Sequence, residues 1–314
     1  MRICSLLPSA TELLYALGAG DDIVGVSHEC DYPPQALEKP RVVRTTVDQE
    51  HLSSAEIDQI VRDAVAHQAS LYELDQQALA EARPDLVVTQ ELCEVCAIDT
   101  THVSRALSRL PFQPRVVALH PHGLEDVFKE AQLLGDIAGH REVAEELVRS
   151  CRARIEQVRK RVATISARPR VLCLEWLEPL MGSGHWVPEM VELAGGMEVL
   201  GRAGEPSRDV TSEEVVHARP EILVLMPCGF SIARARKEVP RLTTQAWWTT
   251  LPAVRSGRVY LVNGPAYFNR SGPRLVDGIE LLAALLHPDQ CADLMPPQAA
   301  ESLVQAEDSK CAHN

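Results

Sequence analysis

The chain has 314 residues, of which 46% are hydrophobic and 24% are charged, so it is long enough for two domains with separate cores. The 31 Lys and Arg residues are outnumbered by 44 Asp and Glu, and the net charge of −13 argues against a general surface for nucleic acid or anionic membrane. No apolar run approaches the roughly 18–20 residues of a membrane span, so we expect no membrane insertion. The nine cysteines are an odd number, and we expect most of them to be reduced thiols.

The N-terminal segment predicts a strand, a helix, a second strand and then a polar loop. The first strand ends at Pro8, and Ser9 with Glu12 three residues later fits a capping box at the start of the helix. Gly18 is typical of a left-handed helix stop, and residues 23–27 form the second strand. Pro8 and Glu12 interrupt what would be the apolar core of a signal peptide, so we expect no leader and a cytoplasmic location.

Strands and helices continue to alternate along the chain in two similar halves. The further strands are predicted at 86–89, 116–119, 171–174, 198–200 and 222–225, and a helix at 187–194. Two matching sequences, Arg83-Pro84-Asp85 and Arg219-Pro220-Glu221, each lead from a helix end into an aliphatic strand. This alternation predicts an α/β fold class with two parallel-sheet lobes covered by helices.

A long helical stretch joins the two halves. Apolar residues recur at helical spacing from Leu124 to about Ala163, and Gly135 and Gly139 divide this stretch into two helices. The predicted domains are an N-terminal lobe at 1–122, a connecting helical segment at 123–165, a C-terminal lobe at 166–297 and a polar, frayed tail at 298–314.

Polar and aromatic residues gather directly after the predicted strands. Ligands bind beyond the carboxyl ends of strands in α/β sheets, so we expect these loops to line one cleft between the lobes. Large rings with a few placed polar groups suit a bulky organic ligand. The expected ligand-binding residues are Pro8, Ser9, His28, Asp31, Tyr32, Gln90, Glu91, His120, His122, Trp176, His185, Trp186, Phe230, Tyr267, Phe268 and Arg270.

One Cys-x-x-Cys motif, formed by Cys93 and Cys96, has the spacing of a soft-metal site, a redox pair or an iron–sulfur cluster. No second such motif follows, so a closed metal site would have to take further ligands from Cys30, His28 or Cys228. Two inert buried thiols are the alternative. The sequence has no Gly-x-Ser-x-Gly elbow, no phosphate loop and no His-Glu-x-x-His helix, so we expect no catalysis.

Several motifs together point to a known family. They are Ser5-Leu6-Leu7-Pro8-Ser9-Ala10-Thr11-Glu12, Val24-Gly25-Val26-Ser27, Asp31-Tyr32-Pro33-Pro34, Arg83-Pro84-Asp85-Leu86-Val87 and Gly195-Gly196. With them the chain resembles, over residues 2–288, the class III (helical-backbone) substrate-binding proteins of iron-chelate and vitamin B12 importers, and is most similar to their cobalamin-binding branch. The resemblance implies two α/β lobes joined by a backbone helix, a corrinoid or metal chelate held between them, and no catalysis.

The resemblance also implies a site for an ABC importer permease, because family members dock through an acidic residue on each lobe. Glu213 fits that place in the second lobe, whereas Gln77 occupies it in the first. The cysteine-bearing loops resemble a leaderless, cobalamin-binding subgroup. We therefore expect a cytoplasmic protein whose partner is a small-molecule chelate, not nucleic acid.

Other functions stay open. One is a Cys/His metal or iron–sulfur protein, and another is an exported importer subunit of the cell envelope or periplasm. An enzyme acting on a corrinoid is a further alternative, with Glu91 and His185 as acid–base groups.

Overall fold

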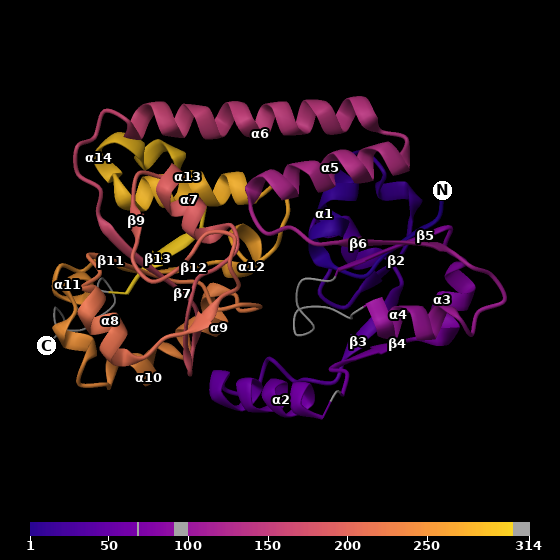
Figure 1. Cartoon of the computed structure of the whole chain (residues 1–314), viewed down its shortest axis with the longest axis horizontal. Coiled ribbons are helices and arrows are strands. Elements are labelled where there is room, and N and C mark those ends of the chain that lie inside the picture. The colour runs from indigo at the N-terminus through magenta and orange to yellow at the C-terminus, as the bar shows by residue number, and fades with distance from the viewer. Residues whose placement is uncertain (68, 91–99, 304–314) are drawn as a thin grey trace, which may run out of the picture. The chain divides into compact units, whose positions relative to one another are not determined.

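The computed structural model describes residues 1–67, 69–90 and 100–303, and the chain divides into two compact units (Figure 1). Unit 1 comprises Met1–Leu52, Glu56–Ser150 and Ser271–Pro273. Unit 2 comprises Ser53–Ala55, Cys151–Arg270 and the described residues from Arg274 onward. The chain therefore leaves unit 1 after Leu52, after Ser150 and after Pro273. Each unit includes one segment of three residues that is distant in sequence from the rest of the unit: 271–273 in unit 1 and 53–55 in unit 2.

Unit 1 contains a six-stranded sheet in the order β4-β3-β2-β1-β5-β6. Its strands are β1 (Ile3–Ser5), β2 (Ile23–Ser27), β3 (Arg41–Thr45), β4 (Tyr72–Leu74), β5 (Leu86–Gln90) and β6 (Arg115–Leu119). Its helices are α1 (Pro8–Ala16), α3 (Gln76–Ala82), α4 (Thr100–Leu107) and α5 (Leu124–Ala138), together with most of α2 (Ser54–Ala66) and the first part of α6 (Arg141–Val162). The central strand β1 is buried along its whole length and pairs in parallel with β2 and β5.

Unit 2 contains a sheet in the order β10-β8-β7-β11-β12-β13, and β9 pairs with β7. Its strands are β7 (Arg170–Leu177), β8 (Leu180–Gly182), β9 (Met197–Glu198), β10 (Arg208–Asp209), β11 (Ile222–Leu225), β12 (Val259–Val262) and β13 (Ala300–Ser302). Its helices are α7 (Val187–Leu193), α8 (Ser212–Ala218), α9 (Ile232–Arg236), α10 (Val239–Thr243), α11 (Pro252–Arg255), α12 (Gly264–Tyr267), α13 (Leu275–Leu286) and α14 (Pro288–Cys291). Short 3₁₀ turns complete the two units at Gly20–Asp22, Pro34–Glu38, Trp248–Thr250 and Ala292–Leu294.

The two-lobe α/β fold class is confirmed, and the strands predicted at 23–27 and 222–225 have those limits in the structure. The sheets are mixed, however, because the pairs β3–β4, β7–β8, β8–β10 and β12–β13 are antiparallel. These pairs lie toward the sheet edges. The sheets thus combine the predicted parallel pairs, such as β1–β2, β5–β6 and β7–β11, with four antiparallel pairs that were not predicted.

The predicted capping box of Ser9 and Glu12 is wrong. Helix α1 begins one residue earlier, at Pro8, and its N-cap is Leu7, without a side-chain cap. Proline suits the first helical position because its missing N–H would have no partner there. The predicted stop is confirmed, since Gly18 follows the helix with φ +82°.

The two central strands are anchored to the rest of their units in the same way. In unit 1, Arg2 donates through Nη2 to the last carbonyl of α3 at 2.6 Å, and its backbone N–H bonds to the Asp85 carboxylate at 2.8 Å. In unit 2, Arg170 donates to the last carbonyl of α8 at 2.6 Å, and its N–H bonds to Glu221 at 2.8 Å. The two "Arg-Pro-acid" joints thus serve one structural purpose, which is to tie a helix end and a strand start to the central strand.

The long helical stretch that was predicted between the two halves consists of two helices. Gly139, with φ +81°, ends α5, and α6 then runs for 22 residues. The unit boundary falls inside α6, after Ser150. Within unit 2, Arg154 of this helix bonds to Asp277 at 2.5 Å and to Glu280 at 2.6 Å on α13. None of the helices in the described part of the chain is long and apolar enough to cross a membrane.

Candidate functional site

The residues that follow β1 in unit 1 belong to its core. Pro8 and Ser9 form the first turn of α1 and are buried. Cys30, which follows β2, is also fully buried, and Thr11 donates a hydrogen bond to its sulfur at 3.1 Å. Pro8, Ser9 and Cys30 thus pack in the core of unit 1, and their role as ligand or metal contacts stays a prediction.

His28, at the end of β2, is half-buried and uncharged at neutral pH. Its ring centroid lies 5.7 Å from that of Tyr72. Burial lowers the pKa of His28 to about 4, and the positive charge of Arg41 acts in the same direction. A neutral imidazole keeps a lone pair for a ligand. Asp31 and Tyr32 continue the same loop and are exposed, so this loop offers one aromatic ring, one carboxylate and one imidazole.

A histidine pair follows β6, the edge strand of the same sheet. The rings of His120 and His122 meet edge to face, with centroids 4.5 Å apart, and both side chains are exposed. Two carboxylates fix the backbone of this loop. Glu130 accepts from the N–H of His120 at 2.5 Å, and Asp126 accepts from the N–H of His122 at 3.2 Å. Burial raises the pKa of Glu130 to about 7.

In unit 2, the predicted aromatic residues separate into half-buried and buried ones. Trp176, at the end of β7, is half-buried and packs on Phe230 with ring centroids 5.1 Å apart. Phe230 and Phe268 are each 1% exposed, and Trp186 is 5% exposed with its indole N–H donated to the carbonyl of Phe268 at 2.7 Å. The core of unit 2 therefore includes Phe230, Phe268 and Trp186, and Phe230 supports the ring of Trp176. The contact of these three rings with a ligand stays a prediction.

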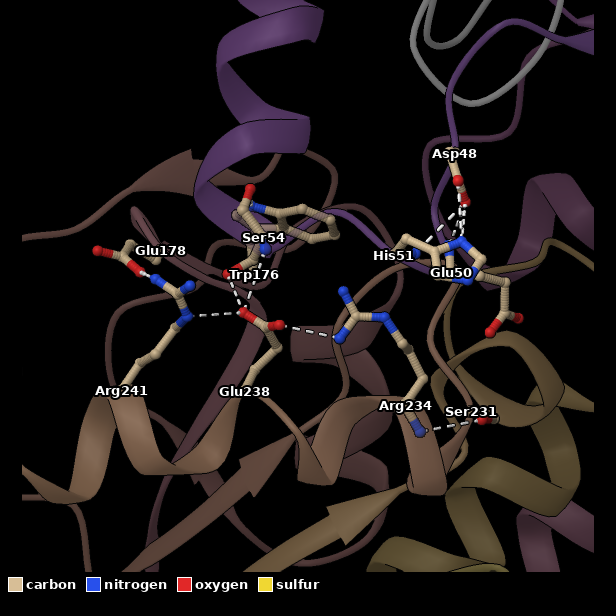
Figure 2. Close-up of polar contacts among 10 residues, drawn as sticks. All are labelled: Asp48, Glu50, His51, Ser54, Trp176, Glu178, Ser231, Arg234, Glu238 and Arg241. Carbon is tan, nitrogen blue, oxygen red and sulfur yellow. Dashed lines mark hydrogen bonds and ion pairs between the residues drawn. The ribbon is translucent and has the colours of Figure 1, made fainter.

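A buried polar cluster lies beside Trp176 (Figure 2). Glu238 is 4% exposed and accepts from Ser54 Oγ at 2.8 Å, from the Ser54 N–H at 3.1 Å and from Arg234 at 2.9 Å. The indole N–H of Trp176 donates to the Ser54 carbonyl at 3.2 Å. Arg234 also lies 4.1 Å above the Phe230 ring. The cluster thus holds Ser54, the first residue of α2 and a part of unit 2, next to the half-buried ring of Trp176 near the end of β7.

The loop after β8 holds His185 in an uncommon backbone conformation. His185 has φ +51°, its N–H donates to the Glu205 carbonyl at 2.6 Å, and its own carbonyl accepts from Gly204 at 2.8 Å. Gly184 lies against the same segment, so that a Cβ there would be 2.6 Å from the Glu205 carbonyl oxygen and would also meet the Ser207 nitrogen. Close contact between two backbones therefore shapes this loop.

Replacing Gly184 with alanine should lower the free energy of unfolding by about 1–3 kcal/mol, because the backbone must move to admit the methyl group. Gly204→Ala is the matched control, because Gly204 has open space around it and only its φ of +77° disfavours a side chain. Urea unfolding of both variants tests this. Equal losses for the two glycines would contradict the close-contact explanation.

The remaining predicted residues divide between the described part of the chain and the rest. Gln90, Cys228, Tyr267 and Arg270 are half-buried; Gln90 ends β5, Cys228 follows β11, Tyr267 ends α12 and Arg270 follows α12. Glu91, Cys93 and Cys96 lie outside the described residues. Among residues 1–67, 69–90 and 100–303, no three His, Cys, Asp or Glu side chains gather closely enough to hold a metal ion. The described residues thus give no support to a metal site that includes Cys30 or Cys228.

Glu213, the predicted docking residue, is exposed in the first turn of α8. Next to it, Thr211 and Glu214 form a capping box, in which each side chain bonds to the backbone of the other. Glu213 thus takes no part in the cap. Its role in docking stays a prediction.

Sequence reasoning missed Glu130, Glu175 and Glu238, the carboxylates that hold these loops. Most of their partners are distant in the sequence: the residue numbers of Glu130 and His120 differ by 10, and those of Glu238 and Ser54 by 184. Only Arg234 and Glu238, four residues apart, carried a local signal for an ion pair.

Two α/β units, each with a parallel central sheet and polar groups at its strand ends, are typical of a ligand-binding protein with two lobes. Comparison with known families agrees with this class. Residues 3–266 match the model of the family described as "Periplasmic binding protein". The match covers more than half of the chain, so the protein belongs to the periplasmic binding protein family.

Relatives extend the similarity along the chain. The vitamin B12-binding protein of Vibrio cholerae is 25% identical over 294 residues, which cover 91% of this chain and 88% of that protein. A crystal structure of periplasmic vitamin B12 binding protein BtuF of Vibrio cholerae is similar over 92% of this chain and 97% of that one, with a TM-score of 0.64 and 25% identity.

Two further proteins widen the range of relatives. The uncharacterized ABC transporter substrate-binding lipoprotein YvrC of Bacillus subtilis is 26% identical over 92% of this chain and 80% of its own length. A periplasmic heme binding protein from Pseudomonas aeruginosa shares the fold, with a TM-score of 0.71 at 20% identity, over 92% of this chain and 93% of that one.

Proposed function

We propose that this protein binds a corrinoid or a related metal chelate through side chains at the strand ends of its two units. The observation that carries the proposal is the similarity to vitamin B12-binding proteins along nine-tenths of the chain. The exposed and half-buried strand-end residues support it, because they combine aromatic rings with imidazoles. They are His28, Tyr32, His120, His122, Trp176, His185 and Tyr267. Rings cover the faces and edges of a large planar ligand, and imidazoles approach its metal or its amides.

Aquocobalamin mixed with the purified protein should show a shifted visible spectrum, and titration calorimetry should give a saturable binding heat. Haem is the competing ligand, because a heme-binding protein shares this fold. Saturable binding of haem with no response to aquocobalamin would show that the ligand is haem and not a corrinoid. No response to either compound would overturn the proposal.

Trp176→Leu should weaken binding of the ligand about tenfold or more, equivalent to about 1.4 kcal/mol, because the variant loses the half-buried ring after β7. Trp247→Leu is the matched control, since Trp247 is also half-buried, packs against Trp248 and is not among the predicted ligand residues. Calorimetry on both variants, each checked by circular dichroism, measures the effect. Equal affinities for the two variants would remove Trp176 from the site.

We further propose that the protein is a binding subunit without catalytic activity, that it serves an ABC importer, and that Glu213 contributes to docking on the permease. Support comes from the family match and from the relative named as an ABC transporter substrate-binding lipoprotein. The names of the relatives favour the cell envelope, and the expected cytoplasmic location receives no support from them. Cell fractionation tests the location. Recovery of the protein in the cytosol alone would contradict an importer role.

The role of Cys93 and Cys96 stays a prediction. Metal analysis of protein purified without oxygen, compared with a Cys93→Ser/Cys96→Ser double variant, tests it. Iron or zinc that is present in the natural protein and lost in the variant would support a bound metal.

A further inference from the structure

The carboxylate of Glu175 joins two segments of unit 2 that are far apart in the sequence. Glu175 precedes Trp176 on β7, at the place where the register of β7 against β8 shifts. Its Oε2 accepts from Ser207 Oγ at 2.5 Å, and its Oε1 accepts from the N–H of Gly184 at 3.4 Å. Glu175 thus bonds at once to the loop that carries His185 and to the segment that loop packs against.

The same two segments are joined by backbone contacts on either side of His185. The reciprocal bonds with Glu205 and Gly204 hold the left-handed conformation of His185. The antiparallel pairing of β8 with β10 continues the contact, with Gly182 opposite Arg208. The direction of the His185 ring therefore depends on the contact between residues 183–186 and residues 204–207. The side chain of Glu175 bonds to both of these segments.

Several titratable groups surround Glu175. Cys173 lies on the same strand, and Glu198 at the end of β9 bonds to the N–H groups of Cys173, Val199, Leu200 and Gly201 at 3.1–3.2 Å. On the other side are His185 and Glu205, which pairs with Arg202 at 3.4 Å. Burial raises the pKa of Glu175 to about 7, and the charge of Glu198 adds to this rise, whereas the bonds from Ser207 and Gly184 oppose it.

We propose that Glu175 is a positioning residue, which in its ionised form holds the 183–186 loop and so presents His185 to the bound ligand. The inference rests on the proposed function for its ligand part only. An ionised carboxylate accepts stronger hydrogen bonds than a protonated one, so loss of the charge loosens the loop. As the pH increases through neutrality, the backbone amides of the loop should become better protected against hydrogen exchange, and the affinity for the ligand should rise.

Glu175→Gln tests this, because glutamine keeps the shape of the side chain and removes the charge. Glu192→Gln, at an exposed position of α7, is the matched control. Amide hydrogen exchange of residues 182–186, measured without ligand between about pH 5.5 and 8.5 and corrected for intrinsic exchange, should show protection that increases with pH in the natural protein and in the control. In Glu175→Gln, protection should stay low at every pH.

Affinity for cyanocobalamin, whose axial cyanide does not ionise, provides the second measurement. At high pH, Glu175→Gln should bind about tenfold more weakly than the control, and its affinity should no longer depend on pH. His185→Ala should lose affinity as well. The double variant Glu175→Gln/His185→Ala should be no weaker than His185→Ala alone, because both changes act through one ring.

The outcomes separate this inference from the proposed function. Unchanged exchange of residues 182–186 in Glu175→Gln would overturn the positioning role, whatever the ligand does. Altered exchange with unaltered affinity, or additive losses in the double variant, would overturn the presentation of His185. If the natural protein binds neither cobalamin nor haem, the proposed function fails, while the exchange data still decide whether Glu175 holds the loop.

Discussion

Replacing Glu238 with alanine should lower the free energy of unfolding of unit 2 by about 3–5 kcal/mol, the typical cost of removing one partner of a buried ion pair. Burial alone would raise the pKa of Glu238, but the hydrogen bonds from Arg234 and Ser54 outweigh it and hold the pKa below its ordinary value. In the alanine variant, Arg234, which is 7% exposed, loses its ion-pair partner, and the N–H and Oγ of Ser54 lose their hydrogen-bond acceptor. Urea unfolding followed by tryptophan fluorescence measures the loss.

The matched control is Glu178→Ala. Glu178 pairs with Arg241 at 2.7 Å, but the two side chains are 48% and 44% exposed, so the loss should stay below about 1 kcal/mol. A loss in Glu238→Ala as small as that in the control would show that the cluster in Figure 2 contributes little to stability. The pH dependence gives a second check. The contribution of Glu238 is present above the ordinary carboxyl pKa, and it should disappear as the pH falls through the lowered pKa of the folded state.

Between pH 4.5 and 7, the free energy of unfolding of unit 1 should fall by about 3 kcal/mol because of Glu130, and Glu130→Gln should abolish this fall. The folded protein keeps a proton on Glu130 in this range, whereas the unfolded chain has released it. Ionisation of Glu130 therefore destabilises the fold as the pH rises, and glutamine removes this loss. Natural protein and variant should have similar stabilities near pH 4.5, and the variant should be the more stable at pH 8.

His28 acts in the opposite direction in the same unit. Its pKa is lowered from 6.5 to about 4, so the unfolded chain binds the proton first and stability falls as the pH decreases through this range. The two effects oppose each other in the natural protein, and Glu130→Gln should reveal a stability that rises with pH. Glu125→Gln, at an exposed position of the same helix, is the control. Parallel pH profiles for the natural protein and Glu130→Gln would contradict a raised pKa for Glu130.

These carboxylates connect stability with the proposed function. Glu130 fixes the loop of His120 and His122, Glu175 fixes the loop of His185, and Glu238 holds the first turn of α2 beside Trp176. Each bonds to backbone N–H groups next to a predicted ligand residue. Binding residues on loops need this kind of support, because a loop alone does not hold a side chain in one direction.

Much of the fold could be predicted because it depends on local patterns. The apolar run at Ile23–Ser27 and the run at Ile222–Leu225 became strands with the predicted limits, and Gly139 separates α5 from α6, whereas Gly135 lies inside α5. Edge strands such as β4 and β10 have only three and two residues, which is too short for a periodic strand signal in the sequence. The order of strands in a sheet likewise depends on contacts between segments distant in the chain.

The candidate site was predicted less well than the fold. The sequence shows which residues come after a predicted strand, but position along the chain does not determine burial. Phe230 and Phe268 were expected in contact with the ligand because they are aromatic, and both are buried. Ser9 and Glu12 had the spacing of a capping box, yet Pro8 starts the helix one residue earlier.

By itself, the sequence determined the α/β class, the two halves and the strand ends at which polar groups gather, because hydrophobic periodicity and turn residues act over a few neighbouring positions. Tertiary structure decided which of those residues are accessible and which carboxylates hold them. Burial sets the pKa values of His28, Glu130 and Glu175, and burial arises only when segments far apart in the chain pack together. The charge and direction of the histidines that we propose as ligand contacts are therefore properties of the folded units.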